Sequence, residues 1–283
     1  MPGGSTPQIV SSFLRKLFAR YPEILATQEG VMFLAYAQSW DDQLVFDLIS
    51  DWPKSDQAFL QRAYGELVGL VSTVKEKDNW VQARDEIMAS GTDNVKIGLA
   101  HSAVNMWSDE KLRQHACEIL IALLKGASKE LVAAVMDVFR VTDELTPDVS
   151  TVELLRALAD AGTDMSAAPS DFVVDRLQAL LPHKPELIAA IAEKLIDAWR
   201  DELGNIQTVT STVAPQLTDL ALTLHRLGGA SRQSGVSIFE ALIGIDAYGA
   251  RQTLAEIDGR FGPRQDAVRR RHPWRRRPRS RHR

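Results

Sequence analysis

The sequence predicts an all-α protein, and two observations carry that prediction. Apolar residues recur every three or four positions along most of the chain, which places them on one face of a helix. Segments rich in glycine, proline and helix-capping residues interrupt this pattern at regular distances. The chain has 283 residues, 45% of them hydrophobic, so it is long enough to bury a large core. We expect about 13 or 14 helices and no sheet.

Four stretches show the helical pattern most clearly, namely residues 57–75, 109–125, 184–204 and 208–227. In the third, an apolar stripe runs from Leu187 to Trp199, whereas charged residues such as Glu193 and Lys194 occupy the other faces. A strand would instead bury every second residue. Each stretch is therefore predicted to be an amphipathic helix.

The breaks between helices contain glycine, proline and residues that cap helices. Examples are DWPKSD (51–56), KGASKE (125–130), DELTPDVS (143–150) and RLGGAS (226–231). Glycine ends a helix because it accepts the left-handed conformation, and Ser, Asp or Thr begins the next by accepting a bond from a free N–H group. The breaks thus predict where helices start and stop.

The spacing of the breaks predicts a repeat. A new helix begins about every 19 residues, so a helix pair recurs about every 38–40 residues, the unit of HEAT- and armadillo-like solenoids. We expect such a solenoid over residues 1–263, in one body or in two halves of about 1–165 and 166–263. A globular multi-helix bundle is the alternative with the same local pattern.

Charge is divided unevenly along the chain. Residues 264–283 hold ten of the 33 basic residues and one of the 37 acidic residues, a net of +9. The remainder has 23 basic against 36 acidic residues, a net of −13. An acidic body repels phosphate, so any binding of nucleic acid is expected to use the terminal segment.

Residues 264–283 are predicted to be a disordered Arg-rich tail, since Pro273 and Pro278 prevent a continuous helix. One interpretation is an arm that binds nucleic acid through phosphate contacts and base stacking. Its candidate contacts are Arg269, Arg270, Arg271, Trp274, Arg275, Arg276 and Arg277. The alternatives are a solvated tail folded back on the acidic body, or a stretch translated from GC-rich sequence out of frame.

No group of residues predicts catalysis, a cofactor or a metal site. Cys117 and His115 lie two residues apart, on different sides of a helix, so Cys117 is expected to pack as a small hydrophobe. His115 and Glu118 share a face, as metal ligands would, but no second such pair occurs, which favours an ordinary surface pair. The phosphate-binding pattern G-x-x-x-x-G-K-[ST] does not occur either.

The single cysteine fits a reducing compartment. No apolar run approaches the roughly 20 residues that span a bilayer, and the first residues do not have the pattern of a signal peptide. We therefore expect a cytoplasmic protein that has no membrane partner.

Residues 185–261 contain the helix LALTLHRL followed by SIFEALIGIDAYGARQTLAEIDGRF. This segment resembles the C-terminal HEAT-like helical segment of large bacterial STAND-type ATP-binding proteins. The resemblance implies a packing role, transfers no catalytic residue, and comes without the NTPase module of those proteins. It implies that the chain is a detached or truncated C-terminal part of a larger ATPase or sensor.

These observations predict a non-enzymatic helical-repeat scaffold that offers an extended surface to a protein partner. A nucleic-acid-binding helical-repeat protein that uses its Arg-rich tail is the alternative. A helical enzyme of unfamiliar type is a third possibility, and it would require a polar cleft in which ionisable groups converge.

Overall fold

The computed structural model describes residues 6–75, 78–142, 145–160, 162, 164–167, 170–201, 213–247 and 249–257. Every regular element in these residues is helical, and they contain no strand, which confirms the all-α prediction. Fourteen of the helices in this part of the chain have eight or more residues. The Arg-rich segment 264–283 lies outside the described residues.

The helices follow the breaks that the sequence predicts. In chain order they are α1 (Thr6–Arg20), α2 (Pro22–Leu25), α3 (Gln28–Ala37), α4 (Asp42–Ile49), η1 (Trp52–Lys54), α5 (Ala58–Lys75), α6 (Asp78–Ser90), α7 (Asp93–Met106), α8 (Glu110–Leu123), α9 (Lys129–Met136), α10 (Val138–Val141), α11 (Val149–Ala159), α12 (Ser170–Leu180), α13 (Pro185–Asp201), α15 (Ala214–Leu227), α16 (Gly229–Gly244) and α17 (Ala250–Ile257).

Polar residues start these helices and glycines end them. The side chains of Asp41, Ser128 and Asp148 each accept a hydrogen bond from a backbone N–H in the first turn of α4, α9 and α11. Gly126 and Gly228, which follow α8 and α15, have φ values of 65° and 76°. Both observations match the expected chemistry of helix ends.

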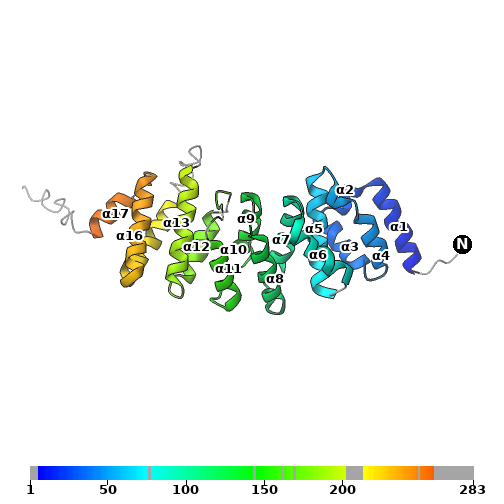
Figure 1. Ribbon diagram of the computed structural model, residues 1–283, viewed down its shortest axis with the longest axis horizontal. Coiled ribbons are helices and arrows are strands. Elements are labelled where there is room, and N and C mark those ends of the chain that lie inside the picture. Colours follow the sequence, from blue (N-terminus) through cyan, green and yellow to red (C-terminus); the bar gives the residue numbers. More distant parts are fainter. Residues whose placement is uncertain are drawn as a thin grey trace, which may run out of the picture.

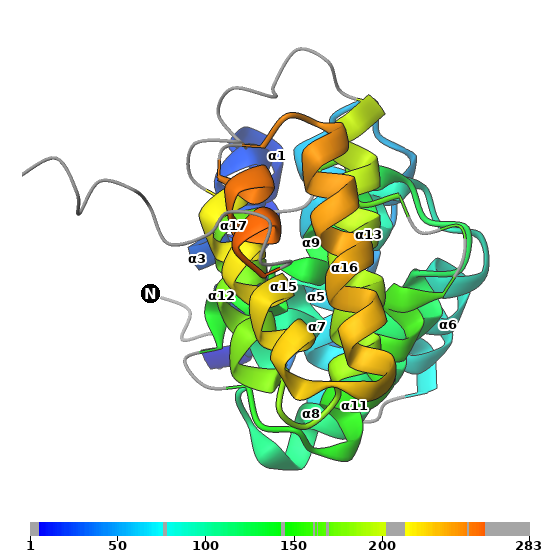
Figure 2. The ribbon, with the colours of Figure 1, turned by 90° about the vertical axis from the view of Figure 1, so that its left-hand side faces the viewer.

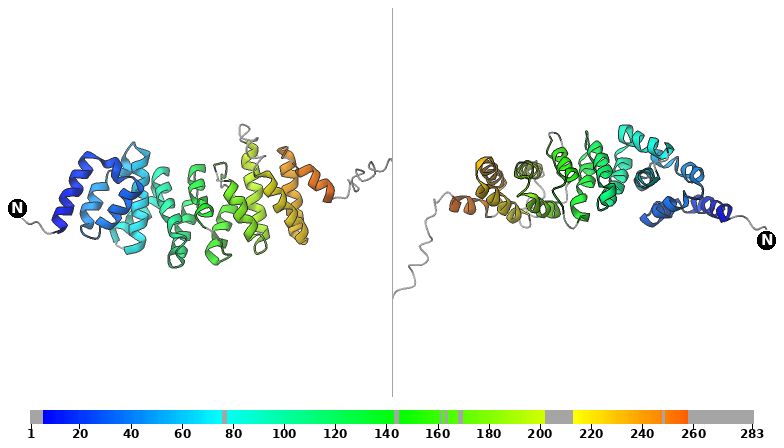
Figure 3. Two further views of the ribbon diagram at one scale, coloured as in Figure 1. Left: turned by 180° about the vertical axis from the view of Figure 1, so that it is seen from behind. Right: turned by 90° about the horizontal axis from the view of Figure 1, so that it is seen from below.

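The molecule is an elongated stack of helix pairs in two layers (Figure 1). One layer contains α5, α7, α9–α10, α12 and α15, and the other contains α6, α8, α11, α13 and α16. Figure 2, which looks along the stack, shows the two layers side by side. Figure 3 shows that the first helices turn out of the line of the others.

Side-chain hydrogen bonds between neighbouring helix pairs recur at similar distances along the sequence. The separations range from 30 residues, between Ser11 and Asp41, to 41 residues, between Asp175 and Gln216. Arg113 and Asp148, 35 residues apart, form a typical example. Each helix pair therefore contacts the next pair along the chain.

One continuous set of buried side chains, from Leu14 to Ala250, fills the space between the layers. It follows the predicted stripes: in α8, for example, Ala116, Ile119 and Leu120 are all buried. Each fully buried Leu or Ile contributes roughly 1.5–3 kcal/mol through removal of apolar surface from water. The core thus runs along the stack instead of forming one central globule.

Glycines bring α5 and α7 unusually close together. A Cβ atom on Gly98 of α7 would overlap the carbonyl oxygen of Arg62 on α5, and one on Gly65 would overlap the carbonyl oxygen of Val95. A Cβ atom on Gly69 of α5 would overlap the side-chain oxygen of Ser102 on α7. This close approach fixes α5 and α7 in one register.

Within the described residues, none of the helices has both the length and the apolar character that crossing a bilayer requires. Among the described residues, the large exposed apolar side chains lie mainly in the first helices, namely Phe13, Tyr21, Ile24, Met32, Tyr36 and Trp40.

Candidate functional site

Two neighbouring hollows lie on the layer formed by α5, α7, α9 and α10, and they share His101 and Asp137. The first has a volume of about 270 Å³ and the second about 260 Å³. We refer to both together as the His101 groove. Its lining residues are Gln28, Arg62, Glu66, Ile97, His101, Val104, Asn105, Glu130, Ala133, Ala134, Asp137, Arg140, Val141 and Ala167.

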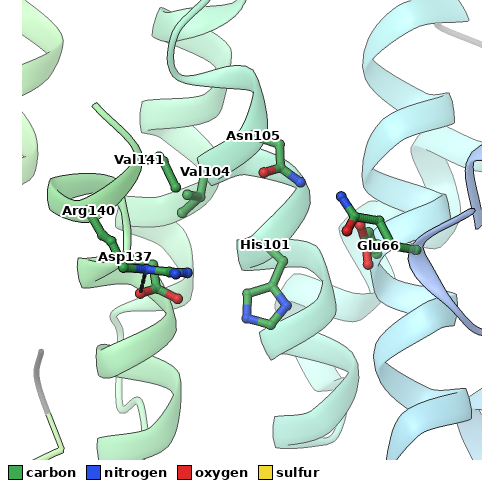
Figure 4. A pocket seen from close by; sticks show the side chains of 8 residues that line it. Glu66, His101, Val104, Asn105, Asp137, Arg140 and Val141 are labelled. Atoms are coloured by element: carbon green, nitrogen blue, oxygen red, sulfur yellow. Dashed lines mark hydrogen bonds and ion pairs between the residues drawn. The ribbon is translucent and has the colours of Figure 1, made fainter. Parts of the chain in front are cut away.

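The polar residues of the groove occupy equivalent positions in successive helix pairs. Glu66 on α5, His101 on α7 and Asp137 at the start of α10 are 35 and 36 residues apart. Gln28 of α3 precedes Glu66 by 38 residues. Because the helix pairs stack with the same period, these four side chains form a row across the layer, which we call the polar column. Figure 4 shows Glu66, His101 and Asp137 facing the space between their helices.

The second hollow is also lined by residues at equivalent positions of successive helix pairs, one helical turn before the polar column. Arg62, Ile97 and Ala133 line it, and they too are separated by 35 and 36 residues. Residues four apart on a helix lie on one face, so Arg62 shares a face with Glu66. The groove is therefore built by repetition of one helix face, with a different side chain in each repeat.

Glu66 is a half-buried carboxylate, and burial raises its pKa above the ordinary value. No hydrogen bond or ion pair joins its side chain to another residue in the part of the chain that the structure describes. A carboxylate that loses water contacts and gains no partner is unusual, since such groups are normally paired. Glu66 is thus an acceptor that is available to a ligand.

His101 is also half-buried and has a lowered pKa. Burial is the main cause, and the charges of Arg62 and Arg140 lower the pKa further, while Asp137 opposes them. The imidazole is therefore neutral at pH 7. On the other wall, the Arg140 Nε donates to the Asp137 carboxylate over 3.1 Å.

The groove brings together the ionisable side chains of Glu66, His101, Asp137 and Arg140. Among the described residues, no Ser, Thr, Cys or Tyr lines either hollow. No hydrogen bond joins His101 to Glu66 or Asp137 among the described residues. The arrangement of donors, acceptors and charges suits recognition of a ligand.

Cys117 lies away from the groove and is buried, as its apolar context predicts. Its thiol donates to the Ser150 carbonyl over 3.2 Å. Burial, with the nearby charges of Glu153 and Asp148, raises the pKa of the thiol to about 12. Cys117 is therefore protonated and packs as part of the core.

His115 forms a pair with Glu118, with 3.9 Å between its Nδ1 and the carboxylate. On the other side, its Nε2 is 3.0 Å from a guanidinium nitrogen of Arg84. Because guanidinium only donates, Nε2 accepts and the proton of a neutral ring lies on Nδ1. No three His, Cys, Asp or Glu side chains gather as metal ligands within the described ranges.

The predicted nucleic-acid contacts, Arg269, Arg270, Arg271, Trp274, Arg275, Arg276 and Arg277, all lie outside the described residues. The sequence expectations did not include Glu66, His101 or Asp137. The signal that would have pointed to them is the spacing of 35 and 36 residues between ionisable residues of successive helix pairs.

Comparisons with protein-family models, with curated proteins and with solved structures give no match.

Proposed function

We propose that this chain is a non-enzymatic scaffold with a HEAT- or armadillo-like solenoid fold, and that it binds an extended segment of a protein partner along the His101 groove. The observation that carries the proposal is the polar column. Packed helices lie about 8–10 Å apart, and an extended polypeptide advances about 3.3 Å per residue. About every third residue of a bound segment would therefore meet one polar group of the column.

The repeat architecture is supported by the contacts between helix pairs, which recur every 30–41 residues. In a solenoid each repeat contacts only its neighbours, so such contacts have nearly constant separation in sequence. A globular bundle would also bring distant helices together. The resemblance of residues 185–261 to STAND-type C-terminal segments supports, by motif alone, a place in a larger ATPase or sensor assembly.

Exposed apolar side chains next to the groove support a protein partner. Among the described residues, Met32 and Tyr36 of α3 are 55% and 62% exposed, and Trp40 follows at 40%. Tyr36 and Trp40 meet edge to face, with ring centroids 4.6 Å apart. Gln28, which lines the first hollow, is followed at intervals of four residues by Met32 and Tyr36. The apolar side chains therefore lie on the same helix face as Gln28 and extend from the hollow. Exposed aromatic and methionine side chains are typical of protein interfaces.

A site-specific cross-linking experiment tests the proposal. A photo-reactive amino acid is placed at Asn105, inside the groove, or at the exposed Gln82 of α6, in the other layer. We expect one partner to be captured from position 105 and not from position 82. The Tyr36→Ala substitution should reduce capture from position 105. The same capture from positions 105 and 82, with no effect of Tyr36→Ala, would refute the proposal.

The charge of residues 264–283 favours a second function, binding of nucleic acid by the tail. Ten arginines and one aspartate would make such binding strongly dependent on salt. The test compares the full chain with a variant in which Arg269–271 and Arg275–277 are glutamine. Binding of a labelled duplex at two salt concentrations should fall in the variant, and equal binding by both proteins would exclude the tail as the contact.

A further inference from the structure

We infer that the chain's own Arg-rich segment, residues 264–283, docks in the His101 groove of the same molecule and places an arginine on the Glu66 carboxylate. The inference rests on the proposed function, because it uses the groove in which the partner would bind. The segment would then compete with that partner.

The main reason is the unengaged negative charge in the groove. Glu66 is half-buried and has no partner among the described residues, and Glu130, in the second hollow, also lacks one there. The groove contains three carboxylates, Glu66, Glu130 and Asp137, and two guanidinium groups, Arg62 and Arg140, so one negative charge is left over. Arg140 donates to Asp137 over 3.1 Å, and Arg62 donates to the amide of Asn94 over 3.2 Å. The neutral His101 adds no positive charge. A cationic ligand is the natural complement of this surface.

Charge complementarity within the chain identifies the occupant. Residues 264–283 carry +9, whereas the rest of the chain carries −13. Arginine suits the site because its planar guanidinium can donate two parallel hydrogen bonds to one carboxylate. The segment has two runs of three arginines, 269–271 and 275–277, separated by His272, Pro273 and Trp274.

The segment is long enough to reach the groove. Contacts link α17 to α15, α15 to α12, α12 to α10 and α10 to α7. A fifth contact links α7 to α5, the helix that carries Glu66. Packed helices lie about 8–10 Å apart, so these five steps cover roughly 40–50 Å. The eighteen residues from 258 to 275 span about 59 Å when extended, so the second run of arginines, 275–277, can reach Glu66. On that path Asp175, 38 residues beyond Asp137, offers a further carboxylate, which accepts from Gln216 over 2.8 Å.

Disulfide trapping in the full chain tests the inference. The Asn105→Cys and His272→Cys substitutions place one thiol in the groove and one in the segment. The Gln82→Cys and His272→Cys pair is the matched control on the other layer. The native Cys117 does not interfere, because it is buried and protonated. We expect the groove pair to form its disulfide about tenfold faster than the control pair, at a rate independent of protein concentration.

Glu66 provides the specific readout. Glu66→Gln should slow trapping at position 105 to the rate of the control pair, and Glu66→Asp should restore most of the difference. An unchanged melting temperature in both variants shows that folding is not the cause. Equal rates for the two pairs, or no effect of Glu66→Gln, would overturn the inference. A rate that rises with protein concentration would also overturn it and would assign the contact to a second copy.

These outcomes separate the inference from the proposed function. Failure of trapping leaves the photo-cross-linking of a partner from position 105 unaffected. Conversely, trapping that succeeds while no partner is captured from the groove would support docking of the segment and refute the scaffold.

Discussion

The guanidinium of Arg113 on α8 lies 2.7 Å from the carboxylate of Asp148, the residue that caps the N-terminus of α11. The same carboxylate accepts from the Thr151 N–H over 2.8 Å, and Arg113 also donates to the Trp107 carbonyl over 3.0 Å. One side chain of α8 thus holds both the end of the preceding helix and the start of a helix in the next pair.

Loss of this link should destabilise the stack. We expect Asp148→Ala to lower the free energy of unfolding by about 2 kcal/mol, because it removes a cap and leaves Arg113 without its partner. Urea denaturation at pH 7 measures the change. Asp219→Asn, at an exposed site on α15, is the control and should stay within about 0.5 kcal/mol of the wild type.

Asp148 should also contribute to stability at acid pH. Burial raises the pKa of its carboxyl, but the hydrogen bonds from Thr151, Arg113 and Thr146 outweigh burial and leave the pKa below the ordinary value. A lowered folded-state pKa stabilises the fold above the unfolded-state pKa of about 3.9, and that stability is lost as the pH falls through the lower value. Between about pH 5 and pH 2, the Asp148→Asn variant should lose less stability than the wild type, because it has no carboxyl group to protonate at this position. An identical acid profile would contradict the assignment.

Gly98 should tolerate no side chain. Alanine normally stabilises a helix interior relative to glycine, by about 1 kcal/mol. At Gly98 the added Cβ would overlap the backbone of Arg62, so we expect Gly98→Ala to destabilise the fold by about 2–3 kcal/mol and to widen the groove. Gly126→Ala is the matched control, because nothing lies within 4 Å of its Cβ position and only its φ of 65° opposes the change. A stabilised Gly98→Ala variant would refute the close approach of α5 and α7.

Cys117 should resist alkylation in the folded protein. Its raised pKa of about 12 leaves almost no thiolate at pH 8, and the side chain is only 1% exposed. Iodoacetamide should therefore label it only after addition of urea, as mass spectrometry would show. Because the folded pKa exceeds the unfolded value of about 8.5, the stability from Cys117 is present below that pH and declines as the pH rises. Rapid labelling without urea would contradict this prediction.

The Glu66 carboxylate should contribute to ligand binding and not to the stability of the fold. Its raised pKa means that the ionised carboxylate opposes folding at neutral pH, and this penalty disappears as the pH falls and the group becomes protonated. We expect Glu66→Gln to leave the melting temperature unchanged or to raise it, with a gain below about 1 kcal/mol because solvent screens the group. Glu186→Gln, at an exposed site on α13, is the control. A clear loss of stability in Glu66→Gln would make Glu66 a structural residue.

Local sequence patterns are sufficient to predict the helices, their ends and their buried faces. The stripe of Ala116, Ile119 and Leu120 is buried as its spacing predicts, and Asp148 and Gly126 mark helix ends as their chemistry predicts. These features depend on interactions between residues within one or two helical turns. Such interactions leave a pattern in a short window of sequence.

Only the tertiary structure brought Glu66, His101 and Asp137 together. Each is one of several polar residues in an amphipathic stretch, and no local pattern distinguishes it from an ordinary surface position. Their meeting depends on how α5, α7 and α10 lie against one another, and the absence of a side chain at Gly98 decides part of that register. Contacts between residues about 35 positions apart are set by packing of whole helices, which local periodicity does not encode.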